Sequence, residues 1–206
     1  SVRGKTFIVP KGTSAHYMLS RWLHVLGLNE RDVNIVDMQP SEAMKAFADG
    51  QGDAIALWAP QTFEAEKLGL KTVAHSSDCN ARQPILLVAN MDYANKHKSD
   101  IVAFLRVYLR SVDMMKKTPA EDLADDYMRF YNAWTGKTMT REEAIRDIKD
   151  HPVYALDQQL DMFKQSYGTS ELREWLHDIV SFQNESGELD RRDLARLERL
   201  HYVTDI

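Results

Sequence analysis

Cysteine is nearly absent from this sequence, because Cys79 is the only one among 206 residues. A single thiol cannot form an intrachain disulfide, and it cannot build a cysteine-based metal cluster. The histidines do not supply a metal-binding pair either, since none of the others stands at a metal-ligand spacing from His16. The sequence therefore predicts neither a disulfide framework nor a metal centre.

Long hydrophobic runs are missing as well. No apolar stretch approaches about 18 residues, the length that a membrane-spanning helix needs. The first residues also lack the basic region, the apolar region and the cleavage site of a secretory signal. Because the sequence starts at Ser1 without a methionine, we expect a processed, truncated or excised chain, whose location in the cell cannot be read from this end.

Concentrated positive charge is the third absence. No run of Lys and Arg exceeds two residues, and the formal net charge is −5. This pattern argues against a nucleic acid or an anionic membrane surface as the partner. The hydrophobic fraction of 44% and the charged fraction of 28% are typical of a globular chain of one or two domains. Any anion that the protein binds is therefore expected to be held at a local site.

The first 90 residues alternate short apolar strands with amphipathic helices. Glycines at 27, 50 and 69 mark helix ends, where a left-handed residue costs least. The alternation predicts an α/β fold with a mostly parallel sheet and helices on its faces. The expected strands cover 6–9, 33–37, 54–57, 71–74 and 85–89, and the expected helices cover 14–26, 41–49 and 61–68.

Strand patterns end at about Met91, and the rest of the sequence reads as a series of helices. Apolar residues recur at helical spacing, and weak breakers such as Thr118-Pro119 separate the segments. More than 100 helical residues need a surface to pack on, and the short sheet offers little. We therefore expect part of their usual packing partner to be missing. The expected helices include 101–112, 123–131, 141–150, 156–166, 172–183 and 191–199.

A candidate anion site lies at residues 12–16, Gly-Thr-Ser-Ala-His, between the first strand and the first helix. A strand that turns through Gly12 into a helix aims backbone N–H groups, hydroxyl donors and the positive helix end at one point. Thr13 and Ser14 are the residues expected to hold the anion. The alternative is that they form an ordinary helix N-cap.

Several segments, in this order and at this spacing, resemble a known family. They are similar to the second half of the substrate-binding proteins of ABC importers in the sulfonate, taurine and nitrate group. The resemblance is carried by KTFIVPKGTSAHY at 5–17, VDMQPSEA at 36–43, Ala46-Phe47, Gly50, Asp53-Ala54 and ALWAP at 56–60.

The resemblance implies an α/β type II periplasmic-binding-protein fold, in which two lobes close over a cleft. Residues 1–90 would be the second α/β lobe, and the helical region 91–206 would belong largely to the first lobe, whose N-terminal part is absent. This chain would then carry one wall of the cleft. The uncovered helices are expected to expose apolar surface and to drive self-association.

The same resemblance implies a function and a location. The protein would be the solute-binding component of an ABC importer. It would capture a small anion, which is sulfonate- or taurine-like, nitrate-like or a related organic acid, between the lobes and would deliver it to an ABC permease. It would be periplasmic or extracytoplasmic, without a cofactor and without catalytic residues.

Side chains beyond the 12–14 turn are candidates for the same site. His16 is expected either to donate to an oxyanion or to bond to backbone as an ordinary helix residue. Trp58 follows a strand end, where its face either covers the ligand or packs in the core, and Gln61 follows it closely. Arg82 is expected either to neutralise the anion or to be solvated. The full predicted ligand set is Gly12, Thr13, Ser14, His16, Trp58, Gln61 and Arg82.

Two other functions remain open from the sequence. Some enzymes of this fold use a cysteine, such as desulfinases or relatives that form the thiamine pyrimidine, and Cys79 lies near the expected cleft loop. Only His75 stands at a spacing that would activate it, so an inert thiol is the alternative. An effector-sensing domain of a regulator shares the topology, but no DNA-binding helical motif accompanies it here.

Overall fold

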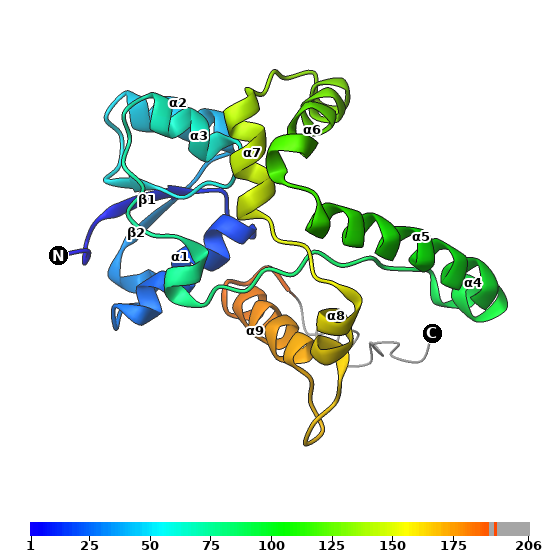
Figure 1. Ribbon diagram of the computed structural model, residues 1–206. Helices are drawn as coiled ribbons and strands as arrows, with labels where there is room; N and C mark the ends of the chain where they lie inside the picture. The colour runs from blue at the N-terminus through cyan, green and yellow to red at the C-terminus, as the bar shows by residue number, and fades with distance from the viewer. Residues whose placement is uncertain (190–191, 193–206) are drawn as a thin grey trace. The chain divides into compact units, whose positions relative to one another are not determined.

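The computed structural model describes residues 1–189 and 192 and divides into two compact units (Figure 1). One unit contains residues 1–84 together with the described residues from 174 onward. The other contains residues 85–173. The helix expected over 191–199 lies outside the described residues, apart from Arg192.

A parallel three-stranded sheet forms the centre of the first unit. β1, Thr6–Val9, lies between β2, Asn34–Asp37, and β3, Ala54–Ile55. In the register, Phe7 pairs with Ile35 on one side and with Ala54 on the other. The expected α/β architecture is therefore confirmed. The helices of this part are α1 Ser14–Val25, α2 Pro40–Ala48 and α3 Gln61–Lys67, with 3₁₀ turns at η1 Glu30–Asp32 and η2 Ser76–Cys79.

The alternation of side chains along β1 fixes which helix packs on which face. Phe7 and Val9 point to one face and pack with Leu19 and Leu23 of α1. Ile8 points to the other face and packs with Ala43 and its neighbours on α2. The two helices thus cover opposite faces of the sheet. Each begins shortly after a strand ends, at the same edge of the sheet.

Two of the expected strands are wrong. Residues 71–74 and 85–89 form no strand, and β3 has two residues instead of the expected four. Ile85 and Val88 are 92% and 90% exposed. A strand needs a neighbour to accept and donate its backbone hydrogen bonds, and the described residues offer none to these two apolar segments.

The second unit is helical, as expected. α6 and α7 pack as a hairpin around Ala124, Met139 and Ala144. The expected helix 141–150 matches α7, whereas α8 ends at Phe163 rather than at 166. The helices are α4 Met91–Lys96, α5 Lys98–Lys117, α6 Ala120–Thr135, α7 Arg141–Asp150 and α8 Leu156–Phe163.

α9, Glu171–Glu185, begins in the second unit and continues into the first. Its Phe182 packs against Tyr17 of α1, with the ring centroids 5.4 Å apart. The assignment of 1–90 and 91–206 to two lobes stays a prediction.

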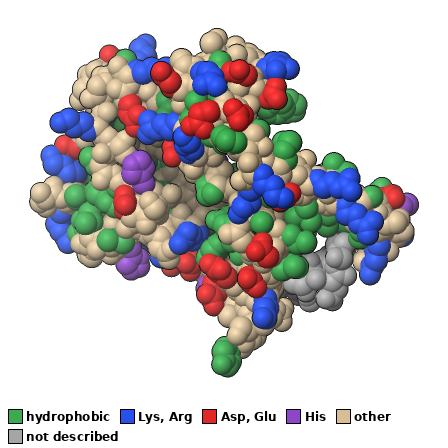
Figure 2. Space-filling view, viewed as in Figure 1, with side chains coloured by type: hydrophobic (Ala, Val, Ile, Leu, Met, Phe, Trp, Pro, Cys, Tyr) green, Lys and Arg blue, Asp and Glu red, His purple; other side chains and the backbone are tan. Residues whose placement is uncertain are grey.

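Exposed apolar side chains are frequent on α5. Phe104, Val107 and Met114 are all more than half exposed, and Figure 2 shows hydrophobic side chains gathered over this helix. Although α5 has 20 residues, neither it nor any other described helix is apolar enough over a sufficient length to span a bilayer.

Candidate anion-binding site

The turns that follow the three strands meet at one edge of the sheet, because parallel strands end on the same side. After β1 comes the turn 10–13 into α1. After β2 comes Gln39, the residue before α2, and after β3 comes Trp58. A hydrogen bond of 2.9 Å from the Lys11 N–H to Asp37 Oδ1 ties the first of these turns to the end of β2.

The turn at 12–14 leaves the N-terminus of α1 without a side-chain cap. Thr13 occupies the N-cap position, but its hydroxyl donates to the Pro10 carbonyl at 2.6 Å. The Tyr17 N–H is the first to bond back to the turn, at the Thr13 carbonyl. The N–H groups of residues 14–16 therefore have no acceptor within the helix and, with the helix dipole, form a site that favours negative charge.

Gly12 makes this turn possible. Its φ of +72° lies in the left-handed region, which costs a residue with a Cβ energy. The Gly12 N–H donates to His16 Nδ1 at 3.2 Å, one turn into the helix. The ring of His16 thus holds the turn from the inner side.

His16 is buried, with 1% of its surface exposed. Because Nδ1 accepts the Gly12 hydrogen bond, the ring proton of the neutral form lies on Nε2, which faces Glu30 Oε1 at 3.1 Å. The ring edge also meets Phe182, with centroids 5.0 Å apart. Nδ1 accepts the Gly12 N–H, and Nε2 lies 3.1 Å from Glu30 Oε1 without a hydrogen bond among the described residues. We therefore assign His16 a supporting position behind the turn.

The segment that contains Arg82 lies beside the start of α1. Gln83 Nε2 donates to the Ser14 carbonyl at 2.9 Å. The guanidinium of Arg82 bonds through Nε to Asn80 Oδ1 at 3.0 Å and lies 5.7 Å from the centre of the Trp175 ring. A role for Arg82 in binding an anion therefore stays a prediction, and in this structure its guanidinium is directed to Asn80 and Trp175.

Trp58 and Gln61 stand after β3, on the same edge of the sheet as the 12–14 turn. Trp58 is 38% exposed, so part of its ring is free to cover a ligand. Gln61 is the first residue of α3, and its buried Oε1 accepts no hydrogen bond from the described residues. A buried acceptor without a hydrogen-bond donor costs free energy. Gln61 Oε1 is therefore placed to accept a hydrogen bond from a ligand.

Glu188 is the residue of this region that sequence reasoning missed. Its Cδ and Oε2 lie 3.1 Å from the point that a Cβ on Gly12 would occupy. The two residues are far apart in the sequence, and no local pattern links them. Gly187 indicates a helix end in the sequence, but it does not indicate that Glu188 would approach Gly12.

Cys79 does not have the environment of a catalytic nucleophile. It is buried, with 3% of its surface exposed, and its Sγ lies 3.5 Å from the Ser76 carbonyl oxygen. Burial raises the pKa of the thiol, so the reactive thiolate is disfavoured. Within the described residues, no group of three or more His, Cys, Asp and Glu side chains is placed to hold a metal ion.

A parallel α/β unit with an uncapped helix N-terminus at the carboxyl edge of its sheet is typical of ligand-binding domains. Residues 1–122 match the sequence model of the NMT1/THI5-like family, and the chain belongs to this family. This match confirms the resemblance drawn from the motifs of residues 5–60.

Relatives and solved structures point the same way. The chain is 31% identical to a Bacillus subtilis protein named "Putative aliphatic sulfonates-binding protein", over 79% of this chain and 50% of that protein. It is 29% identical to a Brachyspira hyodysenteriae protein named as a putative ABC transporter periplasmic binding protein, over 74% and 43%. The crystal structure of the periplasmic aliphatic sulphonate binding protein SsuA from Escherichia coli superposes with a TM-score of 0.59 at 23% identity, over 74% and 50%.

These matches establish the fold and the relationship to ABC transporter periplasmic binding proteins. The chain spans about half the length of the curated relatives it matches. Both of these relatives are named as binding proteins rather than as enzymes.

Proposed function

We propose that this chain belongs to the solute-binding component of an ABC importer and that it binds the acid group of a small anion at the 12–14 turn. The observation that carries the proposal is the uncapped N-terminus of α1 at the carboxyl edge of the sheet. A sulfonate or nitrate group needs several convergent donors and little net positive charge, which backbone N–H groups supply.

Neighbouring residues would bind the rest of the ligand. The ring of the partly exposed Trp58 would cover an alkyl or planar group, and Gln61 Oε1 would accept a hydrogen bond from an N–H or O–H of the ligand. Arg82, held by Asn80 and Trp175, would act through the field of its charge and not by direct contact.

The transport cycle is proposed from the family relationship. A second lobe would supply the opposite wall, and a ligand that contacts both walls would favour the closed state by its differential affinity. The closed protein would then meet an ABC permease outside the cytoplasm. We further propose that the exposed apolar side chains of α5 promote self-association of this chain.

A titration followed by NMR tests the anion site directly. Ethanesulfonate, nitrate and sulfate added to the ¹⁵N-labelled chain should shift the amide signals of residues 13–16 in a saturable way. If none of these anions shifts these signals, the proposal is wrong.

Two variants at Ser14 separate the backbone donor from the hydroxyl. Proline is favoured at the first residue of a helix, and the extended Thr13, with ψ of 174°, suits a following proline. Ser14→Pro therefore removes one N–H without opposing the helix and should weaken anion binding about tenfold. Ser14→Ala keeps the N–H and is the control, with a loss of about threefold or less if the backbone dominates.

A further inference from the structure

Residues 85–89, Ile-Leu-Leu-Val-Ala, form an apolar segment at the start of the second unit that is exposed along its whole length. Ile85 is 92% exposed and Val88 is 90% exposed, and the other three residues are exposed as well. Among the described residues, none forms a backbone hydrogen bond with this segment, and Figure 1 draws it as coil that leads into α4. The segment therefore offers apolar side chains together with unpaired N–H and C=O groups.

The composition of this segment is that of a β-strand. It contains no charged residue, no glycine and no proline, and Ile85 and Val88 are β-branched. Short uncharged segments of this kind pair readily with a second strand when their edge is open. The sequence preference for a strand is therefore present, and only the neighbouring strand is missing among the described residues.

Hydrogen bonds hold the chain on both sides of the segment. Before it, Gln83 Nε2 donates to the Ser14 carbonyl at 2.9 Å. After it, Asn90 Oδ1 accepts the Tyr93 N–H at 3.0 Å and caps α4. Because both flanks are already fixed, pairing of the segment has to order few further residues, which keeps its cost in conformational entropy low.

The charges beside the segment select the direction of a strand that pairs with a second copy. Arg82 stands three residues before the segment and Asp92 stands three residues after it, both are exposed, and no other charged residue lies between them. In an antiparallel pair of two copies, Arg82 of one copy comes to the same end as Asp92 of the other. A parallel pair would bring like charges together, so the charges favour the antiparallel arrangement.

We propose that this segment pairs with the same segment of a second copy as antiparallel strands, about a two-fold axis at Leu87. In this register, Ile85 faces Ala89, Leu86 faces Val88, and Leu87 faces itself. Backbone hydrogen bonds supply the contact, as in other cases of strand addition. The surface is separate from the apolar face of α5, and the inference does not depend on the proposed anion site.

Disulfide trapping tests the register on the full chain. In the antiparallel pair, the two Cα atoms of residue 87 lie about 4.5–5.5 Å apart, within the range of a disulfide. The two Cα atoms of residue 85 lie more than about 13 Å apart, because four residues separate them along the strand. Leu87→Cys and Ile85→Cys are incubated with oxidised glutathione, and the disulfide-linked dimer is measured over time. Leu87→Cys should cross-link at least about tenfold faster.

Exposure alone predicts the opposite order. Ile85 is 92% exposed, whereas Leu87 is 56% exposed, so random collisions would favour the cysteine at 85. The natural chain is the background control, because its Cys79 is only 3% exposed. Both substitutions lie at exposed positions, and the variants are therefore expected to fold. Equal rates, or faster cross-linking of Ile85→Cys, would overturn the inference.

Amide hydrogen exchange of the natural chain is an independent measurement. A strand with one paired edge protects every second amide, so alternate amides of the segment should become protected as the protein concentration rises. Leu87→Lys should reduce this protection at least about tenfold, because two ammonium groups would face each other. Fast exchange at every concentration would contradict the inference. Protection that does not depend on concentration would also overturn it, since the segment would then pair within its own chain.

Discussion

At the scale of single residues, the left-handed glycines differ in what surrounds them. A Cβ on Gly52 would lie 3.1 Å from Ile8 Cγ1 and 3.4 Å from the Thr6 carbonyl oxygen, whereas one on Gly69 would meet nothing within 4 Å. Ile8 is 1% exposed in the centre of the sheet, so it has no room to move. A glycine is thus required at position 52 by both its positive φ and its packing, and at position 69 by its positive φ alone.

Gly52→Ala should lower the free energy of unfolding by about 2–4 kcal/mol, because strain at positive φ adds to overpacking against Ile8. Gly69→Ala should cost about 1 kcal/mol, from the positive φ alone. Urea denaturation of both variants measures the difference. Equal losses in the two variants would show that the contact with Ile8 is relieved at no cost.

In the helical unit, the buried carboxylate of Asp147 contacts two other ionisable side chains. The Tyr127 hydroxyl donates to Asp147 Oδ2, and His151 Nδ1 lies 3.2 Å from Asp147 Oδ1. The hydrogen bond to Asp147 raises the pKa of His151 to about 9, against the opposing effect of burial. Burial alone would raise the pKa of Asp147, but the bonds from His151 and Tyr127 lower it overall.

The pKa of His151 makes stability depend on pH. Because its folded pKa is raised above its unfolded value of 6.5, its contribution is fully present below pH 6.5 and is lost as the pH rises through about 9. Since the side chain is more than half exposed, the loss should be about 1 kcal/mol. Urea denaturation at both ends of this range should show the loss in the natural chain and a smaller one in His151→Gln. A loss of the same size in both would contradict the assignment.

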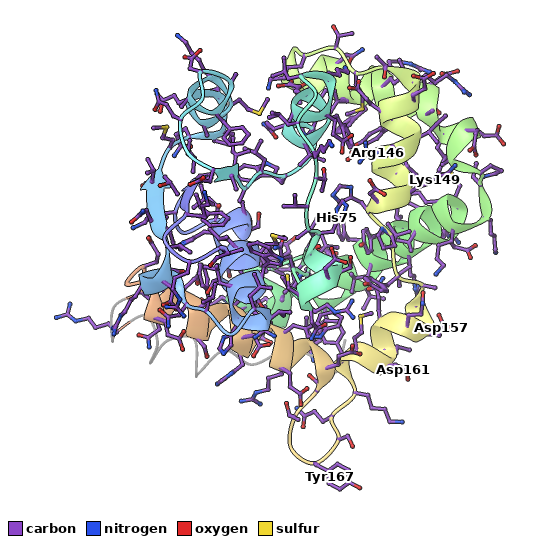
Figure 3. The ribbon with its side chains drawn as sticks, turned by 90° about the vertical axis from the view of Figure 1, so that its left-hand side faces the viewer. His75, Arg146, Lys149, Asp157, Asp161 and Tyr167 are labelled. Carbon is purple, nitrogen blue, oxygen red and sulfur yellow. The ribbon has the colours of Figure 1, made fainter. Side chains whose placement is uncertain are left out.

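At the scale of elements, the loop between α8 and α9 contains a two-residue hairpin turn. Ser166 and Thr169 bond to each other through both backbone groups, and Tyr167 and Gly168 have φ of +53° and +85°. Both central residues are left-handed, as in a type I′ turn. Tyr167 is fully exposed at the tip, as Figure 3 shows, so its ring gains nothing from packing.

Tyr167→Asn should therefore stabilise the protein by about 0.5–1 kcal/mol, because asparagine tolerates the left-handed region better than tyrosine does. Thermal unfolding of the variant measures the gain. Ser166→Asn is the control, since this position is not left-handed and should gain nothing. A destabilised Tyr167→Asn would indicate that the tyrosine makes a contact of its own.

Elements were predictable where their signals are local. α1, α2 and α7 follow from apolar periodicity and from residues that start and stop helices, and β1 follows from an apolar run before Pro10. The segments 71–74 and 85–89 have similar runs but no strand beside them. Strand pairing depends on a neighbouring strand, so an apolar run in one segment does not determine whether that segment forms a strand.

The candidate site was predictable in the same partial sense. Turn 12–14 is contiguous, and its geometry follows from one glycine and a helix start. The contact of Phe182 with the ring of His16 and the approach of Glu188 to Gly12 depend on how the end of α9 packs on α1. Contacts between distant segments leave no trace in either segment alone.

At the scale of the whole molecule, α5 and α6 expose several large apolar side chains. On α5 and α6, Phe104, Val107, Phe130 and Trp134 are each at least 58% exposed. Single exposed apolar residues are ordinary, but a contiguous set of large ones marks an interaction surface. Phe104 and Val107 are three residues apart on α5 and so share one face.

This surface should make the isolated chain self-associate. We expect light scattering after size exclusion to show an apparent mass that rises with protein concentration. Phe104→Glu combined with Val107→Glu should weaken the association at least about tenfold, because two charges would have to be buried in the contact. Val25→Glu, at a comparably exposed position on α1, is the control and should leave the association unchanged. A strictly monomeric chain at all concentrations would mean that the exposed face of α5 is tolerated in water without a second copy.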